Sequence, residues 1–369
     1  MKIRWTGLLA ALTLGWVNAA ELPPPVIGGY YEVGGDYDSY PCDRVHPDYN
    51  ILYNAFLQAG AAGELLLDQE HLPNPELVRH GHQRNLPVLV SLGGVTPFVE
   101  VTATPEKCAA YVDKVIKHVQ KYDYDGIDVD WEHPREPEQG ARWTALIRSL
   151  RSELDKLGKR NGRKMYLTTA LPPGDWAWQH NDFAVMRDCL DYINVMCYDS
   201  GWNSSTYHAP MHANPADPGQ VNFVEQLEFL EKKVGYPRSK IIVGLPFYGN
   251  YFEADQPFVP VDPQHWRQVT YADALKLSEG YKRSYEVNSG GVWAWAPDQK
   301  KLVIYDSPQS IYDKTQYYLN QGYGGVFCWA VNRDVLPDGS QPLTGAMMQS
   351  ANDFSAAQAV KSKKITAGD

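Results

Sequence analysis

Short apolar runs and longer amphipathic runs alternate along this chain of 369 residues. Eight runs rich in β-branched, aromatic and aliphatic residues predict strands, at Val26–Glu32, Asn50–Leu57, Pro87–Gly94, Tyr124–Glu132, Lys164–Pro173, Tyr192–Asp199, Ile241–Gly249 and Gly324–Asn332. Six intervals between them have apolar residues at helical spacing, at Pro75–Arg84, Thr104–Tyr122, Glu138–Lys159, Asp182–Leu190, Phe223–Val234 and Gln309–Gln321. Repeated strand-then-helix order predicts parallel strands joined by right-handed crossovers, and eight such units close a (β/α)8 or TIM barrel of the α/β class. An open doubly wound sheet is less favoured, because no glycine-rich phosphate turn follows the first strand.

One interval is too long to be a simple crossover. Residues 250–323 separate the seventh and eighth predicted strands and are rich in Tyr, Trp, Gly and Pro. Strand-like stretches within them predict a small α+β insertion over residues 251–308, placed on the C-terminal rim of the barrel. The barrel is expected to span residues 21–350, and the tail at 351–369, which ends in polar residues, is expected to fray.

Residues 1–20 have the pattern of a secretory signal peptide. Lys2 and Arg4 precede the apolar run Trp5–Val17, and either Val17-Asn18-Ala19 or Asn18-Ala19-Ala20 resembles a small-residue cleavage site. The apolar run is shorter than the roughly 20 residues that a membrane-spanning helix needs. We therefore expect a secreted protein, either extracellular or periplasmic.

Composition narrows the classes of ligand. With 34 Lys and Arg against 44 Asp and Glu, the formal net charge is −10, which disfavours binding to nucleic acid or to an anionic membrane. The 11 Trp and 24 Tyr residues suit flat, amphipathic ligands such as sugar rings. Five cysteines without a CxxC pair predict neither a disulfide framework nor a zinc site, and Cys197 and Cys328 lie within strand-like runs, where cysteine is usually a small buried apolar residue.

The most informative segment is the fourth predicted strand. Its side chains alternate, with Ile127, Val129 and Trp131 on one face and Asp128, Asp130 and Glu132 on the other. Three carboxyl groups in a confined barrel interior cannot all ionise freely, so their pKa values are pushed apart, which favours acid–base catalysis. Glu132, the residue nearest the mouth, is the expected proton donor. A calcium loop is less favoured, because the EF-hand needs glycine at its sixth position and Gly126 is fourth, counted from Asp123.

This segment resembles the Asp-x-x-Asp-x-Asp-x-Glu signature of glycoside hydrolase family 18, the chitinases and their relatives. The resemblance extends to the other strands, with Ser91–Gly94 similar to the family's Ser-x-Gly-Gly, Met196–Asp199 to its Met-x-Tyr-Asp, Gly244–Gly249 to its seventh strand and Trp329 to its eighth-strand tryptophan. The insertion at residues 251–308 resembles the chitinase insertion domain found in one branch of the family.

The resemblance implies retaining hydrolysis of β-1,4-linked N-acetylglucosamine, in which the substrate supplies its own nucleophile. Glu132 would protonate the glycosidic oxygen, and the acetamido oxygen of the substrate would attack the anomeric carbon to give an oxazolinium ion. Asp130 would hold the acetamido N–H and share a proton with Asp128, while Tyr198 would orient the acetamido oxygen. No metal and no cofactor is implied.

The resemblance also implies a set of sugar-binding residues. These are Asp199, Met196, Trp329, Tyr30, Tyr248, Gly93 and Gly94, with Trp329 stacking under the sugar at the cleavage site. Weaker candidates for outer subsites are Trp176, Trp202, Trp293 and Trp295, each of which could equally serve packing. Val95, Asn250 and His133 depart from residues common in the family, which leaves outer-subsite binding and substrate length open.

The expected partner is therefore chitin or its oligosaccharides, bound by a monomer. Within enzymes, the alternatives are an endo-β-N-acetylglucosaminidase acting on N-glycans and a peptidoglycan hydrolase. A non-catalytic chitin-binding lectin is the alternative from a different class, but such relatives characteristically lose the acid, whereas Glu132 and Asp130 are both present. Exo or endo action is left open.

Overall fold

The computed structural model describes residues 22–34, 40–67, 72–94, 96–201, 203–217, 219 and 221–366, with side chains up to residue 362. The expected signal peptide at residues 1–20 lies outside these ranges, as do Val95 and Trp202. Within the described residues, no helix combines the length and the apolar character needed to cross a membrane.

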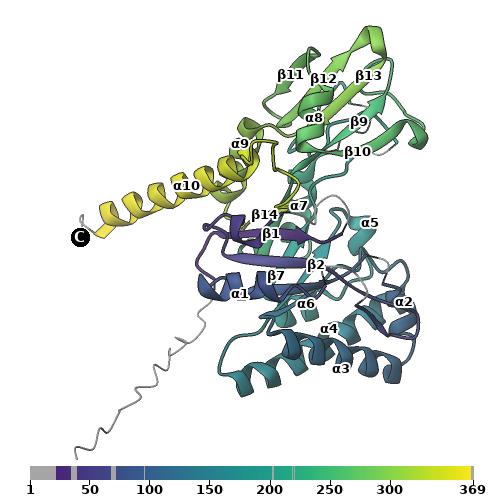
Figure 1. Ribbon diagram of the computed structural model, residues 1–369, viewed down its shortest axis with the longest axis vertical. Coiled ribbons are helices and arrows are strands. Elements are labelled where there is room, and N and C mark those ends of the chain that lie inside the picture. The colour runs from purple at the N-terminus through teal and green to yellow at the C-terminus, as the bar shows by residue number, and fades with distance from the viewer. Residues whose placement is uncertain are drawn as a thin grey trace, which may run out of the picture.

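The centre of the molecule is a closed barrel of parallel strands (Figure 1). Its strands are β1 (Val26–Glu32), β2 (Ile51–Ala59), β4 (Val88–Leu92), β5 (Gly126–Val129), β6 (Tyr166–Leu171), β7 (Tyr192–Val195), β8 (Ile241–Pro246) and β14 (Gly325–Trp329). Each pairs in parallel with its neighbour in this order, and β14 pairs with both β8 and β1, which closes the ring. The short β3 (Leu65–Leu66) pairs antiparallel with the end of β2. The predicted TIM barrel is thereby confirmed.

Helices surround the barrel in the predicted alternation. The crossover helices are α1 (Pro75–Gln83), α3 (Pro105–Tyr122), α4 (Pro137–Asn161), α6 (Phe183–Cys189), α7 (Phe223–Lys232) and α9 (Pro308–Asn320). Shorter turns are α2 (Phe98–Val101), α5 (Asp175–Trp178), η2 (Cys42–Arg44), η3 (Arg238–Lys240), η4 (Pro263–His265) and η5 (Pro297–Gln299). Helix α3 begins as the sequence indicates: Thr104 caps it by accepting a hydrogen bond from the Lys107 N–H group, and Pro105 occupies its first position.

The long interval between β8 and β14 folds as a separate antiparallel sheet. Its strands are β9 (Tyr248–Glu253), β10 (Trp266–Thr270), β11 (Lys282–Glu286), β12 (Gly291–Ala296) and β13 (Lys301–Tyr305), in the order β10-β9-β13-β12-β11, with helix α8 (Tyr271–Leu277). This insertion forms the upper part of the molecule in Figure 1, above the barrel, and has a small core around Phe252, Leu302 and Ile304. Its sheet begins at Tyr248, slightly before the boundary expected at residue 251, because β9 follows β8 after a single residue.

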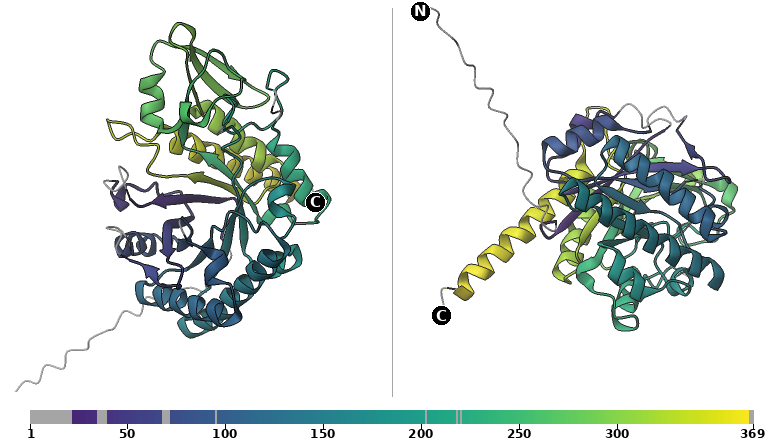
Figure 2. Two further views of the ribbon diagram at one scale, coloured as in Figure 1. Left: turned by 90° about the vertical axis from the view of Figure 1, so that its right-hand side faces the viewer. Right: turned by 90° about the horizontal axis from the view of Figure 1, so that it is seen from below.

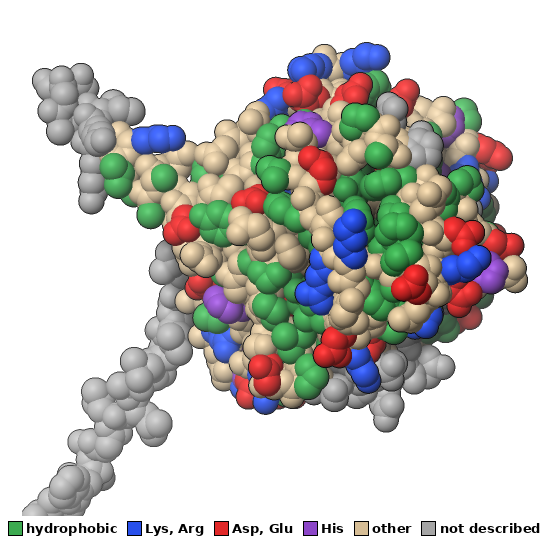
Figure 3. Space-filling view, turned by 90° about the horizontal axis from the view of Figure 1, so that it is seen from above, with side chains coloured by type: hydrophobic (Ala, Val, Ile, Leu, Met, Phe, Trp, Pro, Cys, Tyr) green, Lys and Arg blue, Asp and Glu red, His purple; other side chains and the backbone are tan. Residues whose placement is uncertain are grey.

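The chain ends in helix α10 (Pro342–Thr366), which projects from the barrel (Figure 2). The tail expected to fray from residue 351 is helical up to Thr366. From Ser355 to Ser362 its side chains are exposed, so this stretch is not stabilised by burial. On the face seen from the side of the insertion, acidic and basic side chains are interspersed (Figure 3).

Candidate active site

A cleft of about 610 Å³ lies across the C-terminal ends of the barrel strands. Its lining residues belong to β2, β9, β10, β14 and α7 or to the segments that follow β5, β6, β7 and β14. They are Phe56, Asp130, Glu132, His133, Pro172, Pro173, Trp176, Met196, Tyr198, Asp199, Ser200, Val221, Phe223, Gln226, Tyr248, Gln268, Trp329 and Arg333. This is the end at which barrel enzymes place their active sites, because the loops after the strands meet there.

Asp128 lies beneath the cleft, fully buried inside the barrel. Three hydroxyl groups donate hydrogen bonds to it, from Tyr30 (2.9 Å), Ser91 (2.7 Å) and Thr168 (2.6 Å). These donors belong to β1, β4 and β6, so strands on three sides fix the carboxyl group. Burial raises the pKa of Asp128, and the hydrogen bonds partly offset that rise.

Asp130 and Glu132 continue outward from Asp128 into the cleft. Asp130 is buried, and its Oδ1 atom has no hydrogen-bond partner within the described part of the chain. Burial, followed by the charges of Glu132 and Asp128, raises the pKa of Asp130 well above its usual range. Glu132 is exposed at the cleft surface. The three carboxyl groups therefore differ in solvation: Asp128 is buried and hydrogen-bonded, Asp130 is buried, and Glu132 is exposed.

Tyr198 lines the cleft after β7 and is almost fully buried. Its ring passes close to Gly244 on β8: a Cβ atom there would lie 2.7 Å from the Tyr198 ring and 2.9 Å from the carbonyl oxygen of Val195. Glycine at position 244 thus makes room for this tyrosine. Burial and the neighbouring carboxyl groups raise the pKa of Tyr198, so its hydroxyl group stays protonated and can donate a hydrogen bond.

Asp199, next along the chain, lies in a polar cluster at the cleft wall. The hydroxyl group of Tyr248 donates a hydrogen bond to it, and the charge of Arg333 also favours its ionised form. The Asp199 side chain is 42% exposed, but desolvation by the surrounding cleft wall outweighs both effects and raises its pKa to about 6. His208 lies behind it, buried, with its Nδ1 atom 3.3 Å from the Asp199 backbone nitrogen and 3.2 Å from Nδ2 of Asn250.

His208 is held in its neutral form. Burial lowers its pKa to about 3, helped by the charge of Lys314. Neutral imidazole can accept a hydrogen bond at Nδ1, and the Asp199 N–H group and the Asn250 amide both lie within reach of that atom. Asn250, noted above as a departure from the family pattern, is thus part of the support for Asp199.

Trp329 forms one wall of the cleft at the end of β14. Its ring is only partly buried and packs against Phe56 and Tyr30, each with 5.4 Å between ring centroids. Met196 lines the cleft as well. A partly open indole ring beside buried carboxyl groups suits stacking against a sugar ring.

Three of the expected sugar-binding residues, Tyr30, Gly93 and Gly94, are not among the residues that line the cleft. Tyr30 does not line the cleft: it is 2% exposed and lies below, where it bonds Asp128 and accepts a hydrogen bond from Asn194. Gly93 and Gly94 are also absent from the cleft lining. A Cβ atom at Gly93 would meet Phe56 at 2.7 Å, so this glycine serves packing. Inward alternation along a strand does not determine depth, and contact of these three residues with a sugar stays a prediction.

The outer tryptophans divide into two groups. Trp176 lines the cleft, is 57% exposed and packs edge-on against His133. Trp293 and Trp295 pack against the small core of the insertion instead, and neither lines the cleft.

Sequence reasoning missed Arg333 and His208. Arg333 lines the cleft and lies four residues after Trp329, the last residue of β14. This place in the loop after the last barrel strand could have indicated a site residue, because active sites of such barrels are built from these loops. His208 lies in a long loop after β7, where no pattern indicated burial. The described residues contain no group of three or more His, Cys, Asp and Glu side chains placed to hold a metal ion, and the five cysteines are unpaired.

Comparison with known proteins defines the class. Residues 26–334 match the model of glycosyl hydrolases family 18, and the chain belongs to this family. It is 29% identical to Endochitinase 1 of Metarhizium anisopliae, over 71% of this chain and 64% of that protein, and 25% identical to Chitotriosidase-1 of Mus musculus, over 95% and 82%. The chain spans 61 to 64% of the length of the fungal relatives it matches.

Solved structures share the fold. A chitinase from Trichuris suis superimposes with a TM-score of 0.78 at 21% identity, and a family 18 N-acetylglucosaminidase from Paenibacillus barengoltzii with 0.76 at 23%. Each match covers 88% of this chain and 99% of the other. A chitinase-like agglutinin from Robinia pseudoacacia also matches, with a TM-score of 0.72 at 20% identity, covering 88% of this chain and 99% of that one. The fold is thus shared by proteins named as enzymes and by a protein named as an agglutinin.

Proposed function

We propose that this protein is a chitinase that hydrolyses β-1,4-linked N-acetylglucosamine with retention of configuration. The supporting observation is the Oδ1 atom of Asp130, a buried acceptor without a partner among the described residues, located between Asp128 and the exposed Glu132. An unsatisfied buried acceptor is costly in the free protein. A ligand that brings a hydrogen-bond donor, such as the N–H of an acetamido group, would remove that cost.

The first step breaks the glycosidic bond. With the sugar stacked on Trp329, Glu132 donates its proton to the glycosidic oxygen, and the leaving sugar departs as an alcohol. The acetamido carbonyl oxygen forms a new bond to the anomeric carbon, which gives a cyclic oxazolinium ion. Asp130 accepts the hydrogen bond of the acetamido N–H and stabilises the positive charge, while Tyr198 orients the carbonyl oxygen.

The second step restores the enzyme. Glu132, now ionised, takes a proton from water, and the water oxygen bonds to the anomeric carbon as the oxazolinium ring opens. Two displacements on the same carbon retain the β configuration. Asp128 and Asp130 share one proton, which fits the raised pKa of both groups. Every group used belongs to this chain, to the substrate or to water.

The test is hydrolysis of chitotetraose by the protein and by its Glu132→Gln variant, with product anomers resolved by NMR. We expect initial β-anomers from the wild type and no turnover from Glu132→Gln, which should still bind chitotetraose. Glu136→Gln is the matched control, because Glu136 is exposed just before α4 and does not line the cleft. It should keep full activity.

The outcomes separate the alternatives. Binding of chitotetraose without cleavage by the wild type would indicate a lectin. Cleavage only of an N-glycoprotein or of bacterial cell-wall glycan would indicate an endo-β-N-acetylglucosaminidase or a peptidoglycan hydrolase. Turnover by Glu132→Gln would remove Glu132 from the role of acid.

We also propose that the protein is exported. The basic residues, short apolar run and small-residue site within residues 1–20 support this proposal. Expression in a secreting host should give a mature N-terminus close to Ala20 in the medium or periplasm, and an intact Met1 in the cell fraction alone would contradict it.

A further inference from the structure

The two ends of the cleft differ in how far their linings extend. On the side of Glu132, the lining continues over His133, Pro172, Pro173 and Trp176. These residues follow β5 and β6, which lie across the barrel from β14. The exposed Trp176 ring offers a further apolar surface there. This end has room for a chain that continues past the cleavage site.

The opposite end stops at Arg333, whose side chain is only 10% exposed. Its guanidinium group donates two hydrogen bonds to the carboxylate of Glu32, from Nε at 2.7 Å and from NH2 at 2.8 Å. A third hydrogen bond, of 3.2 Å, reaches Gln268. Because Glu32 ends β1 and Gln268 lies on β10, Arg333 is tied to the barrel and to the insertion at once. Two-pronged pairing of this kind fixes the orientation of the guanidinium plane.

Arg333 also covers the aromatic wall. Its guanidinium carbon lies 5.1 Å from the centroid of the Tyr248 ring and 5.6 Å from that of Trp329. All three side chains line the cleft. The sugar that stacks on Trp329 therefore meets Arg333 at its edge.

A second hollow, of about 350 Å³, lies on the far side of Arg333. Its lining includes Tyr40, Arg44, Thr270, Leu336 and Pro337 together with Arg333. Among the described residues, Arg333 is the only one that lines both this hollow and the cleft. The arginine is thus a partition between two spaces.

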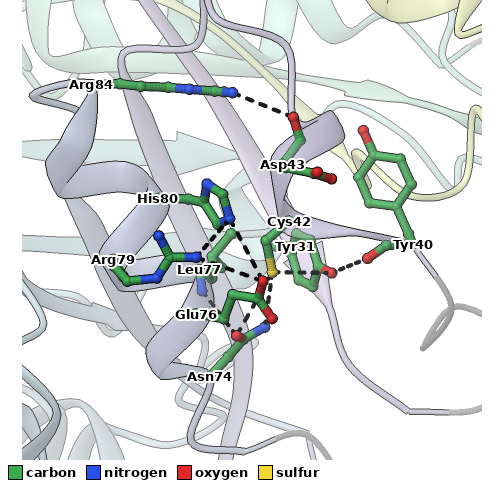
Figure 4. A network of polar contacts seen from close by, with 10 residues as sticks. All are labelled: Tyr31, Tyr40, Cys42, Asp43, Asn74, Glu76, Leu77, Arg79, His80 and Arg84. Atoms are coloured by element: carbon green, nitrogen blue, oxygen red, sulfur yellow. Dashed lines mark hydrogen bonds and ion pairs between the residues drawn. The ribbon is translucent and has the colours of Figure 1, made fainter.

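The part of the second hollow's wall formed by residues 40–44 is held in place by contacts that do not involve Arg333. The Tyr40 hydroxyl group donates to the carbonyl oxygen of Arg44 at 2.9 Å, and Tyr31 donates to the carbonyl oxygen of Tyr40 (Figure 4). Arg84, which follows the last residue of α1, donates a hydrogen bond to the carbonyl oxygen of Asp43 in the same segment. Removal of the Arg333 side chain would therefore join two formed spaces into a longer groove.

We propose that Arg333, held by Glu32, closes the glycone end of the cleft and makes the enzyme exo-acting from the non-reducing end of its substrate. This inference rests on the proposed function, in which Glu132 protonates the oxygen of the leaving sugar. The reducing-end part of the chain then lies on the side of Glu132, and the non-reducing end lies against Arg333. A longer glycone could pass only if Arg333 left Glu32, which would leave a largely buried carboxylate and guanidinium group unpaired.

The test uses chitohexaose labelled at its reducing end, with products followed from the first turnovers. We expect unlabelled products of one or two sugar units and a labelled remainder shortened by the same amount. The viscosity of a soluble chitin derivative should fall only slightly for each reducing end that hydrolysis releases, because cleavage near chain ends shortens the polymer little. Early unlabelled products of three or more units, with a rapid fall in viscosity, would overturn the inference and leave the proposed function standing. No hydrolysis of any oligosaccharide would overturn both.

Variants test Arg333 directly. Arg333→Ala should shift the unlabelled products to three or more units, while Arg267→Ala should leave product lengths unchanged. Arg267 is a matched control, because it precedes Gln268 on β10, is exposed and contacts Tyr251 away from the cleft. If Arg333→Ala does not fold by circular dichroism, Glu32→Gln, which keeps the arginine but weakens its anchor, should give the same shift to a smaller degree. Unchanged products from folded Arg333→Ala, or from Glu32→Gln where it is needed, would overturn the assignment.

Discussion

The hydroxyl group of Tyr30 donates a 2.9 Å hydrogen bond to the carboxyl group of Asp128 inside the barrel, and it links β1 to β5. The same hydroxyl group accepts a hydrogen bond from Asn194 on β7. Three strands that are not neighbours therefore meet at one oxygen atom. Tyr30 thus helps to fix the position of the Asp128 carboxyl group.

Tyr30→Phe should lower the free energy of unfolding by about 1–3 kcal/mol, because Asp128 and Asn194 both lose a buried partner. Urea denaturation measures this loss. Tyr111→Phe is the control: Tyr111 is equally buried, but its hydroxyl group has no partner within the described residues, so its removal should cost little. Equal losses in the two variants would mean that the hydrogen bond to Asp128 does not stabilise the fold.

Gly244→Ala should displace Tyr198 and lower both stability and turnover. The new methyl group would lie 2.7 Å from both the Tyr198 ring and the Phe327 ring, and such overpacking costs about 1–3 kcal/mol. Gly345→Ala on α10 is the matched control, since nothing lies within 4 Å of its added Cβ atom and alanine favours a helix by about 0.5–1 kcal/mol. We expect both the unfolding temperature and the rate of chitotetraose turnover to fall in Gly244→Ala. An unchanged turnover rate would mean that Gly244 does not position Tyr198 for the reaction.

Asp130→Asn and Tyr198→Phe should each lower kcat by about 10²-fold or more, with little change in KM, because both groups act mainly as charge develops in the transition state. Steady-state kinetics on a chitin oligosaccharide measure the two constants separately. Tyr111→Phe again serves as control and should leave both unchanged. A large rise in KM with kcat intact would assign the two residues to ground-state binding.

Asp199→Asn should change the pH dependence of stability. The pKa of Asp199 is raised to about 6 by desolvation, so the folded protein holds this proton more tightly than the unfolded chain does. The resulting stabilisation is complete below the unfolded pKa of about 3.9 and is lost as pH rises through about 6. Relative to the wild type, the variant should therefore be more stable at pH 8 than at pH 4.

Urea denaturation at pH 4, 6 and 8 would measure that difference. Asp188→Asn, at an exposed position on α6, is the control and should keep a constant difference from the wild type across this range. A constant difference for Asp199→Asn as well would show that its carboxyl group titrates alike in the folded and unfolded chain.

The barrel and its acidic segment were readable from the sequence because their signals are local. Strand and helix periodicities appear within a few residues, and each predicted barrel strand overlaps an observed one. The alternation around Asp128 placed three carboxyl groups on one line. It did not separate a buried Asp128 from an exposed Glu132, since depth depends on where each strand ends against its neighbours.

Contacts between distant segments were not readable. His208, Asn250 and Asp199 meet from a loop, the insertion and the end of β7, and Trp293 and Trp295 pack within the insertion although their spacing equally suited a cleft. No pattern along the chain states which loops will meet above the barrel.

The sequence by itself determined the eight strand–helix units, the insertion and the order of the acidic residues, because these depend on short-range periodicity and residue chemistry. Only the tertiary structure decided that Tyr30 supports Asp128 from below and that Arg333 pairs with Glu32, 301 positions away in the sequence. Closure of the barrel brings its first and last strands together. The physical reason is that closure of the barrel determines which side chains line the cleft, whereas local conformational preference determines only the individual strands and helices.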